Sequence, residues 1–365
     1  MNAMSRQTRR IIFYILTLIF LAAGPLIVAY SFGYAFNFST ARFNQTGGIF
    51  IKSKTPRLSV FLDGAFVKET GIFSGSTLLP DIAPGTHLLR LEKQDFHPWS
   101  KTVRVAPSEV TELRAILLAP HPANAATSSR EELAGATGTP APPVALSLDA
   151  RGRLIAGRGR DSKIIIENVH SYALADNTIF FVDKNGFFAR YDMTTKEITS
   201  TSRPGFFLTS AHLRFITGDK FVAIIDPSGG LFLFDRSADA LAALTGGIKD
   251  ASFDSEEKKL VLVSERTVSV LWLADNTHQQ FQKKGVIEQI FSSDSPIREA
   301  RWLYKTDSHI VWRNRDGVFL TEIDRQGGAN TAELISGAVD EIATFPALPS
   351  ALFWRREKTI YKIEL

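Results

Sequence analysis

The stretch from Ile11 to Phe36 constrains this chain most, because it contains no charged residue. About 20 residues of α-helix cross the hydrocarbon core of a bilayer. We therefore predict a transmembrane helix over residues 11–36. The alternative is a cleaved signal peptide, with Ala29-Tyr30-Ser31 or Gly33-Tyr34-Ala35 as the cleavage site. The apolar part of a signal peptide is usually about 7–15 residues long, so the length of this stretch favours a retained anchor.

The residues on either side of this stretch predict its direction in the membrane. Arg6, Arg9 and Arg10 precede it, and basic residues beside a spanning helix favour the cytoplasmic side. Residues 1–10 are therefore expected in the cytoplasm. Aromatic residues favour the opposite interface, and the far end carries Tyr30, Tyr34, Phe36 and Phe38. We expect a single-pass protein of the cell membrane whose C-terminal domains are extracytoplasmic.

Composition excludes several classes of function. The chain has no cysteine, which excludes disulfides, thiol catalysis and cysteine-based zinc sites. Its net charge is +4, and residues 1–46 carry four arginines and no acidic residue, so the remainder is nearly neutral. Phosphate binding needs a concentrated positive surface. The sequence therefore argues against nucleic acid as a partner.

From Gly47 onward, short alternating segments are separated by Gly, Pro and Asp, the pattern of half-buried β-strands. The clearest predicted strands are residues 49–51, 57–62, 65–67, 87–91, 102–105 and 112–117. The dipeptide Asp63-Gly64 predicts a tight turn, because Gly accepts a positive φ and Asp bonds back to the backbone. Residues 47–119 are thus predicted to form a small β domain.

This domain resembles the PEGA family in the order and spacing of its turns. The segments that carry the resemblance are residues 58–64, Leu79-Pro80, 82–87, 92–96 and 103–105. Gly85-Thr86-His87 stands where the family has Glu-Gly-Ala. The resemblance implies a compact antiparallel β-sandwich of bacterial and archaeal envelope proteins, without enzymatic activity, that binds surface-layer or wall components. We expect His87 to be an ordinary strand residue, and Phe96 and Trp99, which flank His97, to be core or interface aromatics.

Residues 120–144 predict a flexible linker, because Pro, Ala, Ser and Thr predominate and no apolar period survives. A typical end-to-end distance for such a segment is ~25–30 Å. The prolines of this region are Pro120, Pro122, Pro140, Pro142 and Pro143. The unit that follows is therefore expected to move independently of the PEGA-like domain.

Residues 145–365 repeat one pattern, in which an apolar strand, a polar turn and a second apolar strand follow one another. The instances start near residues 153, 179, 220, 259, 309 and 351. Four of the five intervals are about 40 to 50 residues long, as for a β-propeller blade. Residues 251–255 and 300–304 precede their strand pairs and are expected to supply innermost strands.

This region resembles TolB-like β-propeller repeats, although Phe253-Asp254-Ser255 and Trp302-Leu303-Tyr304 only approximate the repeat core of that family. The fold class we predict is all-β apart from the N-terminal helix, with a propeller of about six blades. Residues 144–148 are expected to complete the last blade. Five or seven blades remain open, as does an open β-sandwich or a set of irregular sheets.

The sequence indicates no catalytic, cofactor-binding or metal-binding residue. The histidines have no metal-ligand spacing; they are His87, His97, His121, His170, His212, His278 and His309. Ser255 and Lys258 fit a Ser-x-x-Lys motif by letter, but they lie in a predicted turn, whereas the motif needs a helix. The repeat tryptophans are expected to pack between blades; they are Trp272, Trp302, Trp312 and Trp354.

Two hypotheses about function follow. In the first, the chain is a non-enzymatic envelope protein whose propeller is a binding or scaffolding platform for a protein or a wall or surface polymer. In the second, it is an envelope hydrolase whose catalytic residues converge from different blades. A polar funnel with clustered carboxylates or histidines favours the hydrolase, and an apolar funnel favours the platform. A sensory ectodomain is a third hypothesis and would need a signalling partner.

Overall fold

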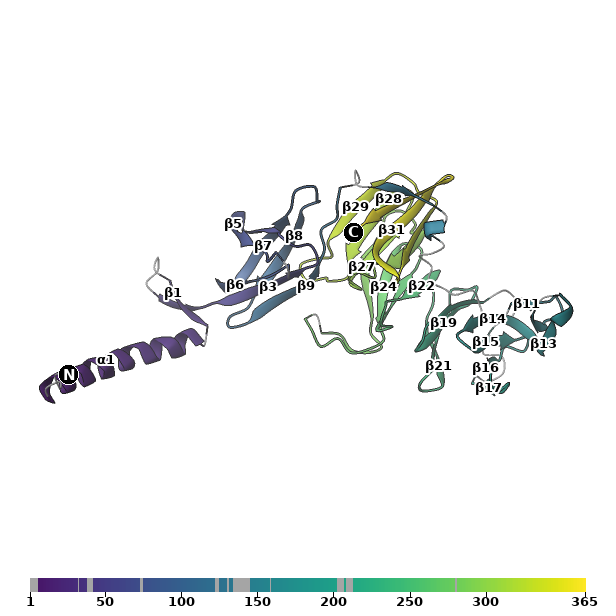
Figure 1. The fold of residues 1–365 in the computed structure, drawn as a ribbon, viewed down its shortest axis with the longest axis horizontal. Helices are drawn as coiled ribbons and strands as arrows, with labels where there is room; N and C mark the ends of the chain where they lie inside the picture. The colour runs from purple at the N-terminus through teal and green to yellow at the C-terminus, as the bar shows by residue number, and fades with distance from the viewer. Residues whose placement is uncertain are drawn as a thin grey trace, which may run out of the picture. The chain divides into compact units, whose positions relative to one another are not determined.

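The computed structural model describes residues 6–31, 33–37, 42–72, 75–121, 125–129, 131–133, 145–157, 159–201, 207, 213–279 and 281–365. These residues form two compact units (Figure 1). The first unit contains residues 1–118 together with residues 326–330, and the second contains residues 119–325 and 331–365. Strands predominate in both units, and the long helix α1 belongs to the first.

Helix α1 spans Arg6–Ser31, with Pro25 inside it, and is long and apolar enough to cross a membrane. A signal sequence near the N-terminus can have the same length and apolar composition. The predicted end at residue 36 was wrong. Gly33, at a φ of +76°, donates its N–H to Tyr30 O at 2.9 Å and ends the helix, as glycine commonly does. Tyr34 begins strand β1 (Tyr34–Asn37), which pairs with β2 (Arg42–Gln45). Phe38 lies outside the described residues.

The segment after α1 is hydrogen-bonded to the small β domain. Gly33 O accepts from Thr46 N at 2.7 Å and from Thr46 Oγ1 at 3.1 Å. Thr46 O accepts from Ser108 N at 2.8 Å. Three segments far apart in sequence are thereby joined through one threonine.

Two sheets share one hydrophobic core in the first unit. The strands are β3 (Gly47–Ser53), β4 (Ser59–Leu62), β5 (Ala65–Glu69), β6 (Ser76–Ile82), β7 (Gly85–Glu92), β8 (Trp99–Val105) and β9 (Val110–Ile116). One sheet has the order β6-β3-β9 and the other β5-β4-β7-β8. Strand β6 was missing from our clearest predictions; it contains Pro80, which an edge strand tolerates. The expectation of a wholly antiparallel domain was also wrong, because β3 and β9 pair in parallel.

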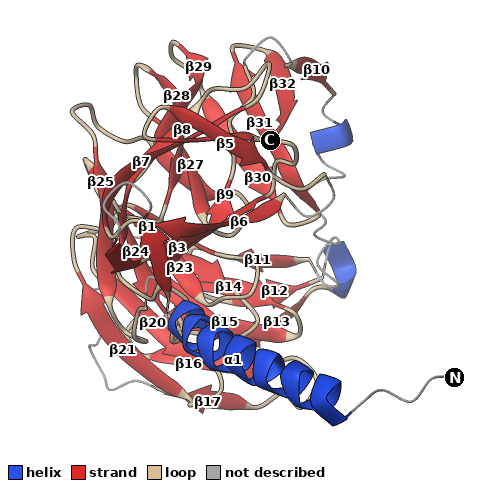
Figure 2. Ribbon diagram, turned by 90° about the vertical axis from the view of Figure 1, so that its left-hand side faces the viewer, coloured by secondary structure: helices blue, strands red, loops and turns tan. Residues whose placement is uncertain are grey.

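The described part of the second unit contains six successive sheets, which follow one another around an arc (Figure 2). The first has β11 (Leu146–Leu148), β12 (Leu154–Ala156) and β13 (Lys163–Ile166), with a 3-10 turn at Gly159–Asp161. The second has β14 (Val169–Ala175), β15 (Thr178–Asp183), β16 (Phe188–Asp192) and β17 (Ile198–Ser200). The third has β18 (Arg214–Thr217), β19 (Phe221–Ile225), β20 (Leu231–Asp235) and β21 (Ala240–Thr245).

The next two sheets repeat this pattern. The fourth has β22 (Asp250–Phe253), β23 (Lys259–Val263), β24 (Thr267–Trp272) and β25 (Ile287–Ser292). The fifth has β26 (Glu299–Trp302), β27 (His309–Arg313), β28 (Gly317–Glu322) and β29 (Thr331–Ser336). Strands β22 and β26 come first in their sheets, as residues 251–255 and 300–304 predicted. The described strands do not show the arc closing into a ring, so a closed propeller stays a prediction.

A recurring turn defines which strands are equivalent. Four turns begin with an Asp or Asn whose side-chain oxygen accepts two backbone N–H groups, and a glycine follows three residues later. The residues are Asp149, Asp183, Asp226 and Asn314. In three of these sheets the turn joins the second strand to the third, but Asp149 lies between β11 and β12. Strand β11 therefore corresponds to the second strand in each of these three other sheets.

The position of a β-bulge supports the same correspondence between the strands of the first sheet and those of the later sheets. In the third, fourth and fifth sheets, the last strand has one extra residue opposite the start of the third strand: Leu244, Ile290 or Leu334. Ile165 of β13 has the same position opposite β12. The predicted pair at residues 153–166 is thus a third and a fourth strand, which explains the short first interval between repeats.

The sixth sheet has the order β10-β32-β31-β30, with β30 (Glu341–Phe345), β31 (Leu348–Arg356) and β32 (Thr359–Glu364). Its outer strand is β10 (Ala126–Ser128), which pairs with β32. Two predictions were therefore wrong. Residues 126–128 of the expected linker form a strand because they pair with β32, and Leu146–Leu148 pairs with β12 and not with the last sheet.

Candidate functional site

The first strands of consecutive sheets lie against one another inside the arc, where β22 contacts β26 and β26 contacts β30. Along these strands side chains alternate in direction. In β26, Ala300 and Trp302 are fully buried, whereas Glu299 and Arg301 keep some exposure. Charged groups from different sheets consequently meet at this inner surface.

Asp250 on β22 is held by arginines from two other sheets. Its Oδ2 accepts from Arg301 Nη1 at 2.6 Å, and its Oδ1 faces Arg214 Nη2 and accepts from Ala251 N. The side chain of Asp250 is 11% exposed. Charge-assisted hydrogen bonds of this kind are short and strong. Both oxygens of the carboxylate are thus occupied.

Glu299 has a comparable environment. Its Oε2 accepts from Arg313 Nε at 2.6 Å and from Ile342 N of β30 at 3.2 Å. Its Oε1 accepts from Arg301 Nη2 at 3.2 Å. We name Arg214, Asp250, Arg301, Glu299 and Arg313 the inner charge network. These five residues lie on three sheets, and the bond from Ile342 N connects them to β30 of a fourth.

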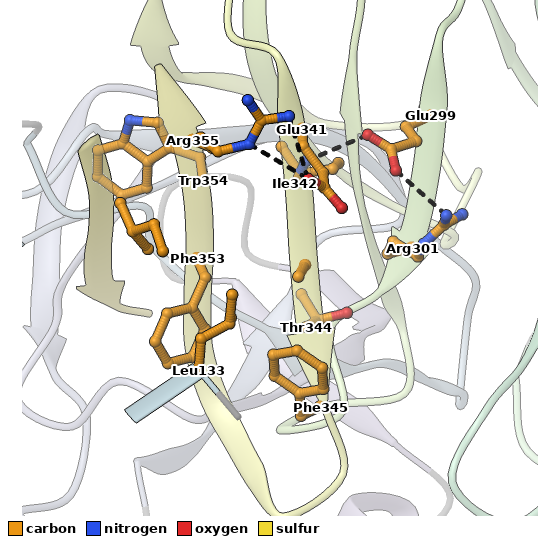
Figure 3. Close-up of a pocket in the computed structure, with 12 residues that line it drawn as sticks. Leu133, Glu299, Arg301, Glu341, Ile342, Thr344, Phe345, Phe353, Trp354 and Arg355 are labelled. Carbon is orange, nitrogen blue, oxygen red and sulfur yellow. Dashed lines mark hydrogen bonds and ion pairs between the residues drawn. The ribbon is translucent and has the colours of Figure 1, made fainter. Parts of the chain in front are cut away.

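A cavity of about 640 Å³ lies beside this network (Figure 3). A volume of about 300–1,000 Å³ is usual for a small-molecule pocket. Glu299 and Arg301 border one side. The other lining residues are Leu133, Glu341, Ile342, Ala343, Thr344, Phe345, Phe353, Trp354, Arg355 and Ile360. Leu133, Phe345, Phe353 and Ile360 belong to one apolar cluster, so the pocket has an apolar compartment beside a charged one.

The charged compartment includes a loosely held arginine. Arg355 Nε and Nη2 each lie 3.4 Å from Glu341 Oε2, longer than the ~2.7–2.9 Å of a strong charge-assisted bond. The side chains of Arg355 and Glu341 are 44% and 59% exposed. Among the residues of the pocket and of the inner charge network, only Trp354 was singled out from the sequence, and as a packing residue. The alternation of charged and apolar residues in Glu299-Ala300-Arg301-Trp302 is the signal that marks one of the strands.

The tryptophans singled out from the sequence are packing residues. Trp302 is fully buried and donates Nε1–H to Ser252 O of the preceding sheet at 2.9 Å. Trp312 contacts Phe291 of the preceding sheet, with ring centroids 4.8 Å apart and the two rings tilted by 32°. Trp272 lies under the Lys259 ammonium. Trp354 stacks on Tyr361 and also lines the pocket.

The Ser255-x-x-Lys258 sequence does not form a catalytic pair. Ser255 donates its hydroxyl to Asp307, and Lys258 pairs with Glu256. Burial raises the pKa of Asp307. Residues 255–258 are in a turn, as predicted.

No group of three or more His, Asp or Glu side chains that could hold a metal ion occurs among the described residues. His87 lies on β7 and bonds Asp63. Trp99 is buried in the core of the first unit, with Phe96 packed against it. His212 lies outside the described residues.

No protein among the curated sequences compared matches the chain. Among solved structures, the β-propeller domain of Cps50 (Swd1) from Myceliophteria thermophila is 8% identical, with a TM-score of 0.36; the match covers 51% of this chain and 62% of that one. YCF48 from Cyanidioschyzon merolae is 11% identical, with a TM-score of 0.40, and covers 76% and 91%. A chain of the COPII outer coat vertex on membranes is 13% identical, with a TM-score of 0.35, and covers 60% and 66%.

Likeness at this level does not identify a shared function. The chain spans less than two thirds of the length of the Cps50 domain that it matches. The family comparison concerns the first unit. Residues 46–118 of this chain match the PEGA domain, one residue earlier at each end than the resemblance predicted from the sequence.

Proposed function

We propose that the chain is a membrane-anchored, non-catalytic binding platform of the cell envelope. Helix α1 would hold it in the cell membrane with residues 1–10 in the cytoplasm, because Arg6, Arg9 and Arg10 lie at that end. The PEGA domain and the six-sheet unit would lie outside the cytoplasm. The partner would be a protein or a wall or surface polymer.

One observation supports the proposal over the hydrolase: Asp250 and Glu299, the two carboxylates of the inner charge network beside the pocket, are already bonded. A general acid or base must be within hydrogen-bond reach of the substrate and exchange a proton with it. Asp250 is occupied by two arginines, and Glu299 by two arginines and the Ile342 N–H. These groups support a role in holding sheets together around a binding pocket.

The PEGA domain supports the envelope role, because its family resemblance implies envelope proteins without activity of their own. The joint at Gly33, Thr46 and Ser108 supports a fixed attachment of this domain to the end of α1.

Photo-crosslinking in cells tests the proposal. A photo-reactive amino acid replaces Glu341 at the pocket in the full-length chain, and Ile198, exposed on β17, in the control. We expect a discrete crosslinked partner from position 341 and none from position 198. Equal crosslinking from both positions argues against a platform centred on the pocket. Hydrolysis of an envelope polymer or ester by the purified chain that is lost in Glu299→Gln favours the hydrolase.

A further inference from the structure

We propose that the pocket beside β30 binds an extended peptide segment that presents an apolar side chain next to a carboxylate. This inference deepens the proposed function and rests on it. The carboxylate belongs either to an acidic side chain or to the C-terminus of the peptide, since both groups have the same recognition chemistry.

The apolar compartment provides the first part of the argument. Leu133, Phe345, Phe353 and Ile360 line one side of the cavity. In Figure 3, Leu133, Phe353 and Phe345 lie together below Arg355 and Glu341. The cavity volume of about 640 Å³ exceeds that of one side chain, so it also accommodates the adjoining peptide backbone.

Arg355 provides the second part. Two of its N–H groups share one oxygen of Glu341 at 3.4 Å. Its Nη1 donates to Glu357 O at 3.2 Å and lies 3.5 Å from Asp340 Oδ2, so the planar guanidinium has several acceptors but makes no strong bidentate pair. Arginine matches a carboxylate best through two parallel N–H···O bonds. Glu341 is more than half exposed and is able to turn into water when a carboxylate of the ligand replaces it. Glu299 offers no competing site, because three donors already bond it.

Thr344 provides the third part. Its residue is 8% exposed, it lines the cavity, and its Oγ1 is buried with no hydrogen-bond partner. A buried hydroxyl without a partner is unfavourable, because it has lost its hydrogen bonds to water. Rotation about χ1 moves the hydroxyl to another staggered position, so a ligand in the cavity could draw it toward itself. A peptide amide is able to donate to this hydroxyl or accept from it.

Strand β30 indicates that the ligand is extended. In the described sheet β30 is the end strand and pairs with β31 alone. The N–H of Ile342 points from the other edge to Glu299. Peptides commonly bind by adding a strand to a sheet edge, with side-chain pockets providing specificity. Because Ile342 N–H is already bonded and β26 contacts β30, a peptide would add only to the part of this edge beyond Ile342, toward Thr344. A fatty acid also combines an apolar chain with a carboxylate, but it has no amide groups for this edge or for Thr344.

Fluorescence anisotropy with labelled hexapeptides tests the inference on the full-length protein in detergent. One peptide ends in leucine with a free carboxylate, and a second has the same sequence with an amidated end. A third carries leucine followed by aspartate in its interior and is amidated. A serine and glycine peptide is the negative control, and octanoate is the competitor.

We expect saturable binding of the first or third peptide, at least tenfold tighter than that of the negative control. The amidated second peptide separates the two sources of the carboxylate. Arg355→Gln should weaken binding at least tenfold, and Arg355→Lys should weaken it less. Thr344→Val, which keeps the side-chain shape, should weaken it severalfold. Arg356→Gln, on the neighbouring exposed residue that does not line the cavity, is the matched control and should bind as the unaltered chain does.

The inference is overturned if no peptide binds saturably, if Arg355→Gln and Thr344→Val bind as tightly as the unaltered chain, or if octanoate binds but the peptides do not. If the peptides fail while position 341 still crosslinks a discrete partner in cells, only the ligand class is wrong. If both experiments fail, the proposed function is wrong as well.

Discussion

The imidazole Nδ1 of His87 lies 2.7 Å from the Asp63 Oδ2, across 24 residues of chain. The other ring nitrogen, Nε2, lies 2.7 Å from the carbonyl oxygen of Ala83. Both partners are acceptors, so both nitrogens donate only when the ring is the imidazolium. The bond to Asp63 raises the pKa of His87, and the bond from His87 lowers the pKa of Asp63. His87 thus joins two turns of the PEGA domain when it is protonated.

This pair predicts a loss of local protection as the pH rises. Because the pKa of His87 is raised on folding, its contribution is complete below the unfolded value of about 6.5 and is lost as the pH rises through the folded value. Asp63 contributes above its unfolded value and loses this contribution as the pH falls through its lowered pKa. We expect faster amide exchange at Leu88, whose N–H bonds Asp63, once His87 deprotonates.

Hydrogen–deuterium exchange corrected for the intrinsic rate provides the measurement, with His87→Gln as the control. The variant should lose the step in protection across the titration of His87. An unaltered chain with no such step would show that the pair does not fasten these turns.

The buried pair of Lys259 and Asp254 predicts a large effect on stability. Lys259 Nζ lies 2.6 Å from Asp254 Oδ2, with side-chain exposures of 11% and 1%, and it also faces the rings of Trp272 and Trp302. Removal of one partner leaves a buried charge without compensation and typically costs about 3–5 kcal/mol. Lys259→Met should therefore lower the unfolding transition of the second unit markedly, as followed by tryptophan fluorescence.

The double variant Lys259→Met with Asp254→Asn is the informative comparison. It removes both charges and should recover a large part of the lost stability. If both single variants and the double variant are as stable as the unaltered chain, the pair makes no net contribution to stability.

The recurring turn predicts a smaller effect. Asp226 Oδ1 accepts from Ser228 N and Gly230 N, each at 2.8 Å. Asp226→Ala removes both acceptor contacts and should destabilise the second unit by about 1–2 kcal/mol. Asp219→Ala, at an exposed position, is the control and should remain within about 0.5 kcal/mol of the unaltered chain. Chemical denaturation in detergent gives both values, and equal midpoints for the two variants contradict the prediction.

The absence of cysteine makes the predicted topology directly testable. Single cysteines replace Thr8, before the apolar core of α1, and Ala125, just before β10. In intact cells a membrane-impermeant thiol reagent should label position 125 and spare position 8. The protein should also remain with membranes in alkaline carbonate. The reverse labelling pattern would place the two units in the cytoplasm. Release of the protein by carbonate would show that α1 does not anchor it in the membrane.

Local patterns in the sequence predicted the strands well, because alternation and turn residues act over a few positions. The pairs at Phe221–Ile225 with Leu231–Asp235 and at His309–Arg313 with Gly317–Glu322 show this directly. The strands of the first sheet were matched to the wrong strands of the later repeats because they are short. For this reason Leu146–Leu148 was expected in the last sheet. The recurring turn at Asp149 carries the information that corrects this alignment.

The pocket was beyond prediction from local patterns. Arg301 reaches Asp250 across 51 residues, and Arg313 reaches Glu299 from a neighbouring strand. Each residue alone is an ordinary charged position in a strand. Glu299 and Arg313 are cross-strand partners in one sheet. Arg301 and Asp250 are brought together only by the packing of one sheet on the next, and such packing has no period in the sequence.

The strand β10 has a mechanical consequence. Along the covalent chain that follows β9, Ala126–Ser128 is the first described strand of the six-sheet unit. These residues are fastened to Lys362, Tyr361 and Ile360 of β32, near the opposite end of the polypeptide. A pulling force on the segment between β9 and β10 would therefore meet this three-residue pairing before any other strand of the unit.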